Sequence, residues 1–126
     1  MRPNLLLHRC GSCETAGRPS SSSSDCLNFA TWNVRSLIGL GKIECVIQEM
    51  QALNLDILSL SETHWKETGD FLTQLPNQTE KYRIIFSGGD QHRKGVGIIL
   101  REEVSKSVLY YDTKSERSMV TKIQGK

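Results

Sequence analysis

A single carboxylate, Glu62, closes an apolar run and is the residue in this sequence best placed to do chemistry. The run covers residues 55–61, reads Leu-Asp-Ile-Leu-Ser-Leu-Ser, and is followed by Thr63 and His64. A buried strand that ends in one glutamate can anchor Mg²⁺, which often binds one or two carboxylates and fills its other positions with water and substrate phosphate. A solvated or capping glutamate would show the same pattern, so the spacing alone leaves both readings open.

A second polar residue, Asn33, ends an earlier β-forming segment. An Asn amide can donate a hydrogen bond to a phosphate oxygen and can accept one from a metal-bound water. Asn is also a frequent turn residue at the end of a strand. His64 has the same two readings, since it could donate to a phosphate or simply lie on the surface. No Ser-His-Asp triad is indicated, because no nucleophile elbow is present.

Two strands and one helix must position these residues. Residues 27–34 alternate and favour β-structure, and residues 42–53 carry apolar side chains at the spacing of one helical face. Four of the seven residues 55–61 are apolar (Leu55, Ile57, Leu58 and Leu60), and we interpret this run as a strand covered on both faces. Strand, helix and strand within about 35 residues predict a βαβ unit with parallel strands. Ligands of such sheets collect beyond the C-terminal strand ends, where Asn33 and Glu62 would both lie.

The rest of the chain predicts further strands. We expect residues 64–81 to be irregular, with a helical turn around Phe71–Leu75. Residues 82–87 and 95–101 favour an antiparallel hairpin. Residues 104–111 and 118–123 are two more strand candidates. Gly95-Val96-Gly97 could be a phosphate loop, but the third glycine and the helix are missing, so close backbone packing explains it better.

Charge is distributed unevenly along the chain. Residues 1–80 hold 6 basic and 9 acidic side chains, and residues 81–126 hold 10 basic and 5 acidic ones. A basic flank suits a polyanion such as a nucleic-acid backbone, while an acidic cluster suits a cation. Arg93, Lys94 and Arg117 could contact phosphates, or they could protect exposed strand edges.

Length and composition allow one domain. The first 26 of the 126 residues form a Ser-rich segment that we expect to be disordered, with a domain boundary near Cys26. Cys10 and Cys13 have the spacing of half a zinc site but lack a second pair, which favours a chance occurrence. Cys45 falls in the expected helix and is most simply a core residue. No signal peptide or membrane span is indicated, so we expect an intracellular protein, nuclear or cytoplasmic, with no membrane association.

The motifs together resemble a known family. Thr31-Trp32-Asn33-Val34, Leu60-Ser61-Glu62-Thr63-His64 and Lys94-Gly95-Val96-Gly97-Ile98-Ile99-Leu100 occur in the order and spacing of the exonuclease–endonuclease–phosphatase superfamily. Residues 33–37, the Gly41-Lys42 pair and the closing Gln124-Gly125-Lys126 are most similar to the endonuclease domain of LINE-type retrotransposons. The resemblance covers residues 27–126.

The resemblance implies a four-layer α/β sandwich and Mg²⁺-dependent cleavage of phosphodiesters. It matches Glu62 to a metal-ligand glutamate and Asn33 to an active-site asparagine. Arg35 departs from the family, many members of which carry Asp or Asn at that position. No residue here matches the family's later Tyr, Asp-x-Asn and Asp-His residues. The resemblance therefore implies that residues 27–126 are the N-terminal half of the domain, a partial sandwich whose second sheet is missing.

Three functions follow as hypotheses. The first is a truncated Mg²⁺-dependent DNA endonuclease domain of retroelement origin, weakly active or inactive, with Asn33 and Glu62 as surviving site residues and Glu62 as metal ligand. The second is a non-enzymatic module that binds nucleic acid through its basic C-terminal third. The third is a phosphatase of the same superfamily. The expected partner is the DNA phosphate backbone, with no small-molecule cofactor.

Overall fold

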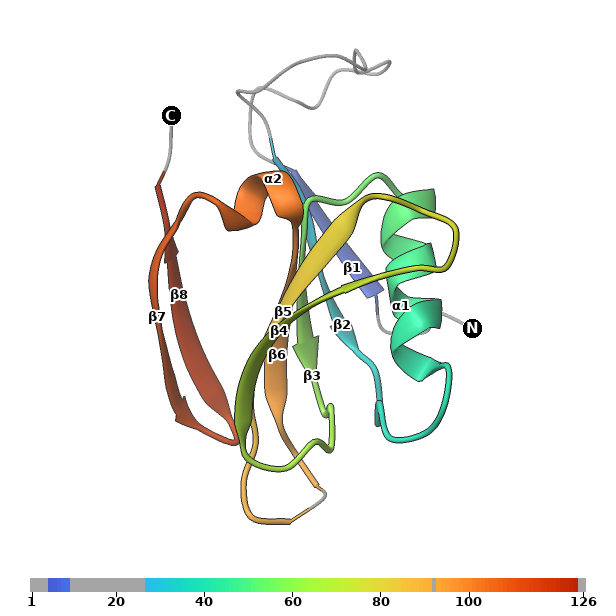
Figure 1. Ribbon diagram of the computed structural model, residues 1–126. Coiled ribbons are helices and arrows are strands. Elements are labelled where there is room, and N and C mark those ends of the chain that lie inside the picture. The colour runs from blue at the N-terminus through green and yellow to red at the C-terminus, as the bar shows by residue number, and fades with distance from the viewer. Residues whose placement is uncertain (1–4, 10–26, 92, 125–126) are drawn as a thin grey trace.

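A six-stranded mixed sheet forms the centre of the molecule, which is known from a computed structural model that describes residues 5–9, 27–91 and 93–124 (Figure 1). The strand order is β1-β2-β3-β6-β5-β4, and β2 and β3 are parallel while the other neighbours are antiparallel. The strands are β1 (Leu5–Arg9), β2 (Asn28–Asn33), β3 (Ile57–Ser61), β4 (Thr68–Gln74), β5 (Lys81–Ser87) and β6 (Val96–Arg101). The predicted α/β class is confirmed.

The predicted βαβ unit is present, with helix α1 (Lys42–Ala52) connecting β2 to β3. Val46, Ile47 and Met50 lie on the buried side of α1, as the helical spacing predicts, and pack on one face of the sheet. Cys45 was predicted to be a core residue, and this prediction is wrong because Cys45 is exposed. It precedes the buried stripe by one residue, about 100° around the helix from Val46.

The second face of the sheet is covered by a hairpin. Strands β7 (Val108–Ser115) and β8 (Ser118–Ile123) form a two-stranded antiparallel sheet, which follows the short helix α2 (Glu102–Ser105). Figure 1 shows this hairpin and α1 on opposite sides of the main sheet. The hairpin packs against a second core cluster that contains Ile85 and Leu100. Where the resemblance implied a missing second sheet, two strands of a second layer are therefore present.

Two segments differ from the sequence-based expectation. The predicted helical turn around Phe71–Leu75 is wrong, because β4 is a strand that pairs with β5 along its whole length. Leu5–Arg9 was expected to be disordered, yet it forms β1 and pairs with β2. In both cases the segment is a strand because it pairs with a neighbouring strand. The local sequence alone does not predict this pairing. Residues 1–4 and 10–26, with Cys10 and Cys13, lie outside the described residues, and disorder there stays a prediction.

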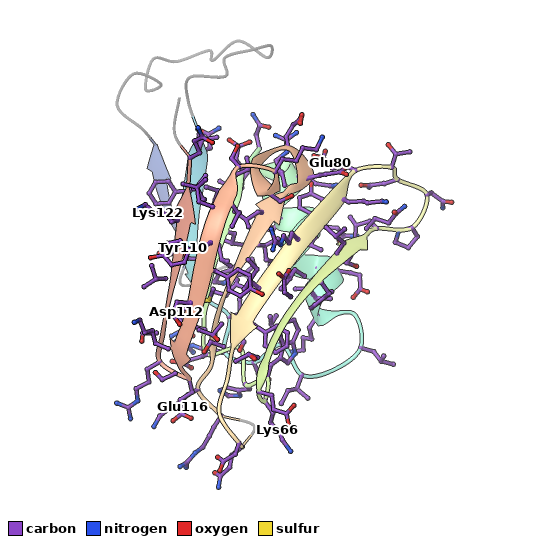
Figure 2. The ribbon with its side chains drawn as sticks, turned by 60° about the vertical axis from the view of Figure 1, so that its left-hand side comes forward. Lys66, Glu80, Tyr110, Asp112, Glu116 and Lys122 are labelled. Atoms are coloured by element: carbon purple, nitrogen blue, oxygen red, sulfur yellow. The ribbon has the colours of Figure 1, made fainter. Side chains whose placement is uncertain are left out.

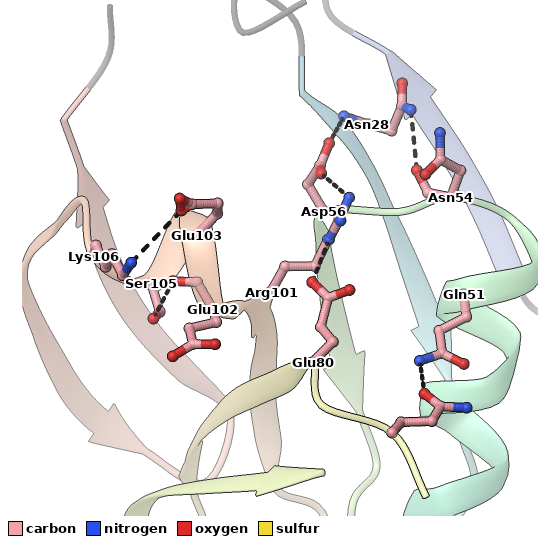
Figure 3. A network of polar contacts seen from close by, with 11 residues as sticks. Asn28, Gln51, Asn54, Asp56, Glu80, Arg101, Glu102, Glu103, Ser105 and Lys106 are labelled. Carbon is pink, nitrogen blue, oxygen red and sulfur yellow. Dashed lines mark hydrogen bonds and ion pairs between the residues drawn. The ribbon is translucent and has the colours of Figure 1, made fainter. Parts of the chain in front are cut away.

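A polar network fastens the end of the sheet where β2 and β3 begin (Figure 3). The carboxylate of buried Asp56 accepts 2.8 Å from the Asn28 amide N–H and 3.0 Å from Arg101 Nη1. Arg101 Nε donates to Glu80 at 3.0 Å, and Asn28 Nδ2 donates to the Asn54 carbonyl at 3.1 Å. These contacts join the ends of β2, β3, β5 and β6. The polar side chains at this end of the sheet therefore hold the strands together.

Candidate functional site

The opposite end of the sheet gathers the loops that carry the predicted site residues. Backbone pairing forms one row across five strands, namely Asn33, Ser61, Val96, Ser87 and Thr68. Each member of this row is the first or last residue of its strand, so a loop begins or ends next to it. Loops 34–41, 62–67 and 88–95 therefore emerge side by side, although they are up to about 60 residues apart in the sequence.

Asn33 and Glu62 meet at this end. Asn33 Nδ2 donates a hydrogen bond of 2.8 Å to Glu62 Oε2. The contact follows from the parallel pairing of Asn33 with Ser61, because that register puts the residue after Ser61 next to the end of β2. Glu62 is exposed to solvent, while Asn33 is half-buried. The structure thus brings together the two residues that strand topology predicted to converge.

Backbone contacts hold the Glu62 loop from both sides. On one side Ser36 N donates 2.7 Å to the Glu62 carbonyl, and Leu37 N donates 2.8 Å to the Thr63 carbonyl. On the other side Thr63 N donates 3.1 Å to the Gly95 carbonyl. Thr63 is fully buried, so the residue next to Glu62 anchors the loop in the protein. Glu62 is consequently presented from a fixed backbone position rather than from a free loop.

Left-handed backbone is concentrated in these loops. Of the eight non-glycine residues with positive φ among the described residues, six lie here: Arg35, Ser36, Glu62, His64, Glu67 and Lys94. Each such conformation costs roughly 1–3 kcal/mol and persists only where surrounding contacts impose it. Glu62 itself has φ 59°. Strain of this kind clusters at functional sites, which supports this end of the sheet as the candidate site.

The predicted substrate-binding residues come from neighbouring loops. His64 N donates 2.6 Å to the Lys94 carbonyl, and both residues have left-handed backbone. Gly95 N donates 2.8 Å to the Glu116 carbonyl, which brings the β7–β8 turn and the adjacent Arg117 to the same end. Arg93 lies one residue before Lys94 and is exposed. The backbone thus gathers His64, Arg93, Lys94 and Arg117 around the Glu62 loop, and their phosphate contacts stay a prediction.

The two glycines of Gly95-Val96-Gly97 serve packing. A Cβ on Gly97 would lie 3.1 Å from the Ile85 carbonyl oxygen of the neighbouring strand, and Gly95 is buried with φ 97°. The segment enters strand β6, not a helix. Close backbone packing, the better of the two sequence-based readings, is the one that the geometry supports.

The donor atoms present suit a hard divalent cation. Glu62 has one carboxylate oxygen, Oε1, that the Asn33 hydrogen bond does not use. Asn33 Oδ1 is shielded from solvent and has no hydrogen-bond partner, which leaves a second oxygen available near Glu62. Within the described residues, no group of three or more His, Cys, Asp or Glu side chains converges on a possible metal position. Glu62 Oε1 and Asn33 Oδ1 are the oxygens that would hold such an ion, with water and phosphate at its other positions.

An open pocket that sequence analysis missed lies along the same loop. It has a volume of about 540 Å³ and is lined by Trp65, Lys66, Glu67, Phe71 and Phe86. A helical turn was expected at Phe71, whereas β4 presents this side chain beside Phe86 of β5. Residues 68–74 show no alternation of apolar and polar side chains, so the sequence held no clear signal for this arrangement.

A charged cluster lies on the sheet face toward β7. Arg83 donates to Asp70 through Nε at 2.9 Å and Nη2 at 2.7 Å, and its guanidinium lies 5.8 Å from the centre of the Tyr111 ring. The hydrogen bond from Arg83 holds the pKa of Asp70 below its usual value. The hydrogen bond between Tyr111 and Asp70 raises the pKa of Tyr111. The ion pair joins β4 to β5, and Tyr111 brings the hairpin strand β7 against it.

No helix in the described part of the chain is long and apolar enough to cross a membrane.

The chain is similar in sequence to known proteins. Residues 30–121 match the model of the endonuclease/exonuclease/phosphatase family. Craniofacial development protein 2 from Bos taurus and its counterpart from Tragulus javanicus are each 36% identical to the chain over 98 residues. The alignments cover 78% of this chain and 16% of each relative, so the chain spans about a sixth of the length of these curated relatives. No solved structure matches the chain.

Proposed function

The chain belongs to the endonuclease/exonuclease/phosphatase family, and from this premise we propose that it supplies one part of a Mg²⁺-dependent DNA endonuclease site of retroelement origin. The observation that carries the proposal is the 2.8 Å contact between Asn33 and Glu62 at the C-terminal ends of two parallel strands. The retroelement branch is supported by the run Asn33-Val34-Arg35-Ser36-Leu37.

Glu62 would hold the ion through its carboxylate, and Asn33 would orient that carboxylate. When bound, Mg²⁺ polarises a phosphoryl oxygen and offsets negative charge that develops on the phosphate. The Asn33 amide donates to Oε2 and so leaves Oε1 directed elsewhere. The fixed loop backbone around Glu62 reduces the reorganisation that metal and phosphate binding would require.

Turnover by this chain alone should be slow. The family's later Tyr, Asp-x-Asn and Asp-His residues, which include its general base, have no match among residues 27–126. Positioned proton transfer contributes about 10²–10⁴ in rate. We therefore propose weak cleavage by the chain, below that of a site with a general base in place.

Nicking of supercoiled plasmid DNA in Mg²⁺ tests the proposal. Wild-type chain should nick slowly, and EDTA or Glu62→Gln should abolish nicking. Glu44→Gln is the matched control, because Glu44 is an exposed carboxylate on α1 and its loss should change nothing. Nicking that persists in Glu62→Gln would rule out Glu62 as the metal anchor. Fast nicking by wild-type chain would rule out the claim that the site lacks a base.

The second candidate is binding of nucleic acid without cleavage. It is favoured by the basic residues at the loop end, where exposed Lys66, Arg93 and Arg117 flank the site. Figure 2 shows Lys66 and Glu116 together at the end of the molecule away from Glu80. Binding through phosphate contacts weakens steeply as salt rises. DNA affinity that is equal at low and high salt would exclude this mode.

A further inference from the structure

Three aromatic rings meet at the pocket beside the Glu62 loop. Trp65 and Phe86 lie 4.9 Å apart between ring centres at an interplanar angle of 68°, and Phe71 lies 6.2 Å from Trp65 and 6.3 Å from Phe86. Phe71 remains 40% exposed. Three rings from three segments therefore surround an opening of about 540 Å³.

Glycine positions make room for these rings. A Cβ on Gly69 would lie 2.4 Å from Phe86 Cε1, so the Phe86 ring occupies the space over Gly69 on the neighbouring strand. A Cβ on Gly88 would lie 1.9 Å from the Trp65 carbonyl oxygen. The Trp65 backbone thus approaches the β5–β6 loop more closely than any residue with a side chain would permit.

Hydrogen bonds then fix the wall of the pocket. Glu67 N donates 2.8 Å to the Gly89 carbonyl, and Gly88 N donates 2.6 Å to the Glu67 carbonyl. Trp65 N donates 3.4 Å to Oγ1 of Thr63, the buried residue that follows Glu62. The pocket and Glu62 consequently belong to one anchored loop, residues 62–67.

The chemistry of the lining selects a ligand. Aromatic walls suit a planar ring, because base–aromatic stacking is a general means of binding single-stranded nucleic acid. Lys66 adds an exposed cation that can contact a phosphate, and Glu67 adds a carboxylate that can accept from an exocyclic amine. A purely apolar ligand would form no polar contact with Lys66 or Glu67.

We propose that Trp65, Phe71 and Lys66 form a subsite for one unpaired nucleobase of a strand whose phosphate reaches Glu62. The proposal deepens the proposed function and rests on it for the identity of the strand. In this arrangement the base stacks on the solvent-facing rim of the ring cluster, against Phe71 and beside Trp65, and Lys66 pairs with its phosphate.

Tryptophan fluorescence provides the test in EDTA, where no cleavage occurs. The chain has two tryptophans, so Trp32→Phe leaves Trp65 as the reporter. A short single-stranded DNA should quench Trp65 and bind about tenfold or more tightly than an abasic sugar-phosphate oligomer of equal length. Equal affinity for the two oligomers, or binding of DNA without quenching, would overturn the subsite.

Two variants separate stacking from charge. Phe71→Leu keeps an apolar side chain at an exposed position and should reduce the preference for bases to less than about threefold. Lys66→Ala should weaken the binding of both oligomers by a similar factor. The preference for the oligomer with bases should stay unchanged. A preference unaltered by Phe71→Leu would contradict the proposal, and the midpoint of thermal unfolding verifies that this variant folds.

The subsite and the proposed function can fail separately. Base preference measured in EDTA should survive Glu62→Gln. If nicking depends on Glu62 but no base preference exists, only the subsite is wrong. If the chain prefers oligomers with bases but nicking does not depend on Glu62, only the proposed catalytic role of Glu62 is wrong.

Discussion

Asn33 Nδ2 lies 2.8 Å from Glu62 Oε2, although 29 residues separate the two in the chain. The contact joins the ends of two parallel strands, so the sheet register fixes it. Asn33 thereby limits the orientation of the carboxylate.

Replacement of Asn33 tests this positioning role. Asn33→Ala should reduce Mg²⁺-dependent nicking by roughly tenfold, because the hydrogen bond to a charged group contributes about 1.5 kcal/mol. Stability should change little, since the pair is exposed to solvent. Plasmid nicking and thermal unfolding measure the two effects. Unchanged nicking would show that Glu62 needs no orienting partner.

The Asp56 network at the other end of the sheet should matter for stability alone. Asp56→Ala leaves the buried Asn28 backbone N–H without its acceptor and leaves the Arg101 guanidinium with Glu80 alone, which should cost about 1–3 kcal/mol in the free energy of unfolding. Glu103→Ala is the control, because its 3.7 Å pair with Lys106 is largely exposed and should contribute less than about 0.5 kcal/mol. Urea unfolding compares the two. Equal effects would contradict the assignment of this network as structural.

Much of this arrangement was predictable from local patterns. The spacing of Val46, Ile47 and Met50 predicted α1, and the run of residues 55–61 predicted the buried strand β3. Together they imposed parallel strands and placed Asn33 near Glu62. Edge strand β4 gave no such signal, because its pattern of burial lacks clean alternation and its partner β5 decides its conformation.

The aromatic pocket was beyond prediction for a related reason. It depends on contact between loops 62–67 and 88–95, which are paired through Gly88 and Glu67. The Gly88-Gly89 pair predicts a turn. It does not predict which part of the backbone will lie where a Cβ would otherwise be. The family resemblance, by contrast, rested on short motifs in order and is confirmed over residues 30–121.

The close approach at Gly88 gives a further prediction. Gly88→Ala would force its Cβ against the Trp65 carbonyl oxygen and should cost about 1–3 kcal/mol in the free energy of unfolding. It should also remove the base preference, because the pocket wall must shift. Gly41→Ala is the control, with no atom within 4 Å of its Cβ and a cost of about 1–2 kcal/mol from its left-handed φ alone. Base preference retained in Gly88→Ala would disprove the link between this contact and the pocket.

Acidification should weaken the ion pair between Asp70 of β4 and Arg83 of β5. The pKa of Asp70 lies below its unfolded value because of Arg83, so its contribution to stability is present above the unfolded pKa and is lost as pH falls through the folded pKa. The pair is partly exposed, and its contribution should be below about 1 kcal/mol. Urea unfolding of wild type and Asp70→Asn should therefore differ near neutral pH and converge in acid. A difference that grows in acid would reverse the sign and contradict the assignment.

The central claim is that Glu62 anchors a divalent cation, and paramagnetic broadening of backbone amide signals by Mn²⁺ tests it most directly. Substoichiometric Mn²⁺ should broaden the NMR signals of Asn33, Glu62 and Thr63 first, and Mg²⁺ should restore them by competition. Glu62→Gln should lose this broadening, whereas Glu44→Gln should keep it. Broadening centred elsewhere, or broadening near Asn33 that persists in Glu62→Gln, would contradict the claim.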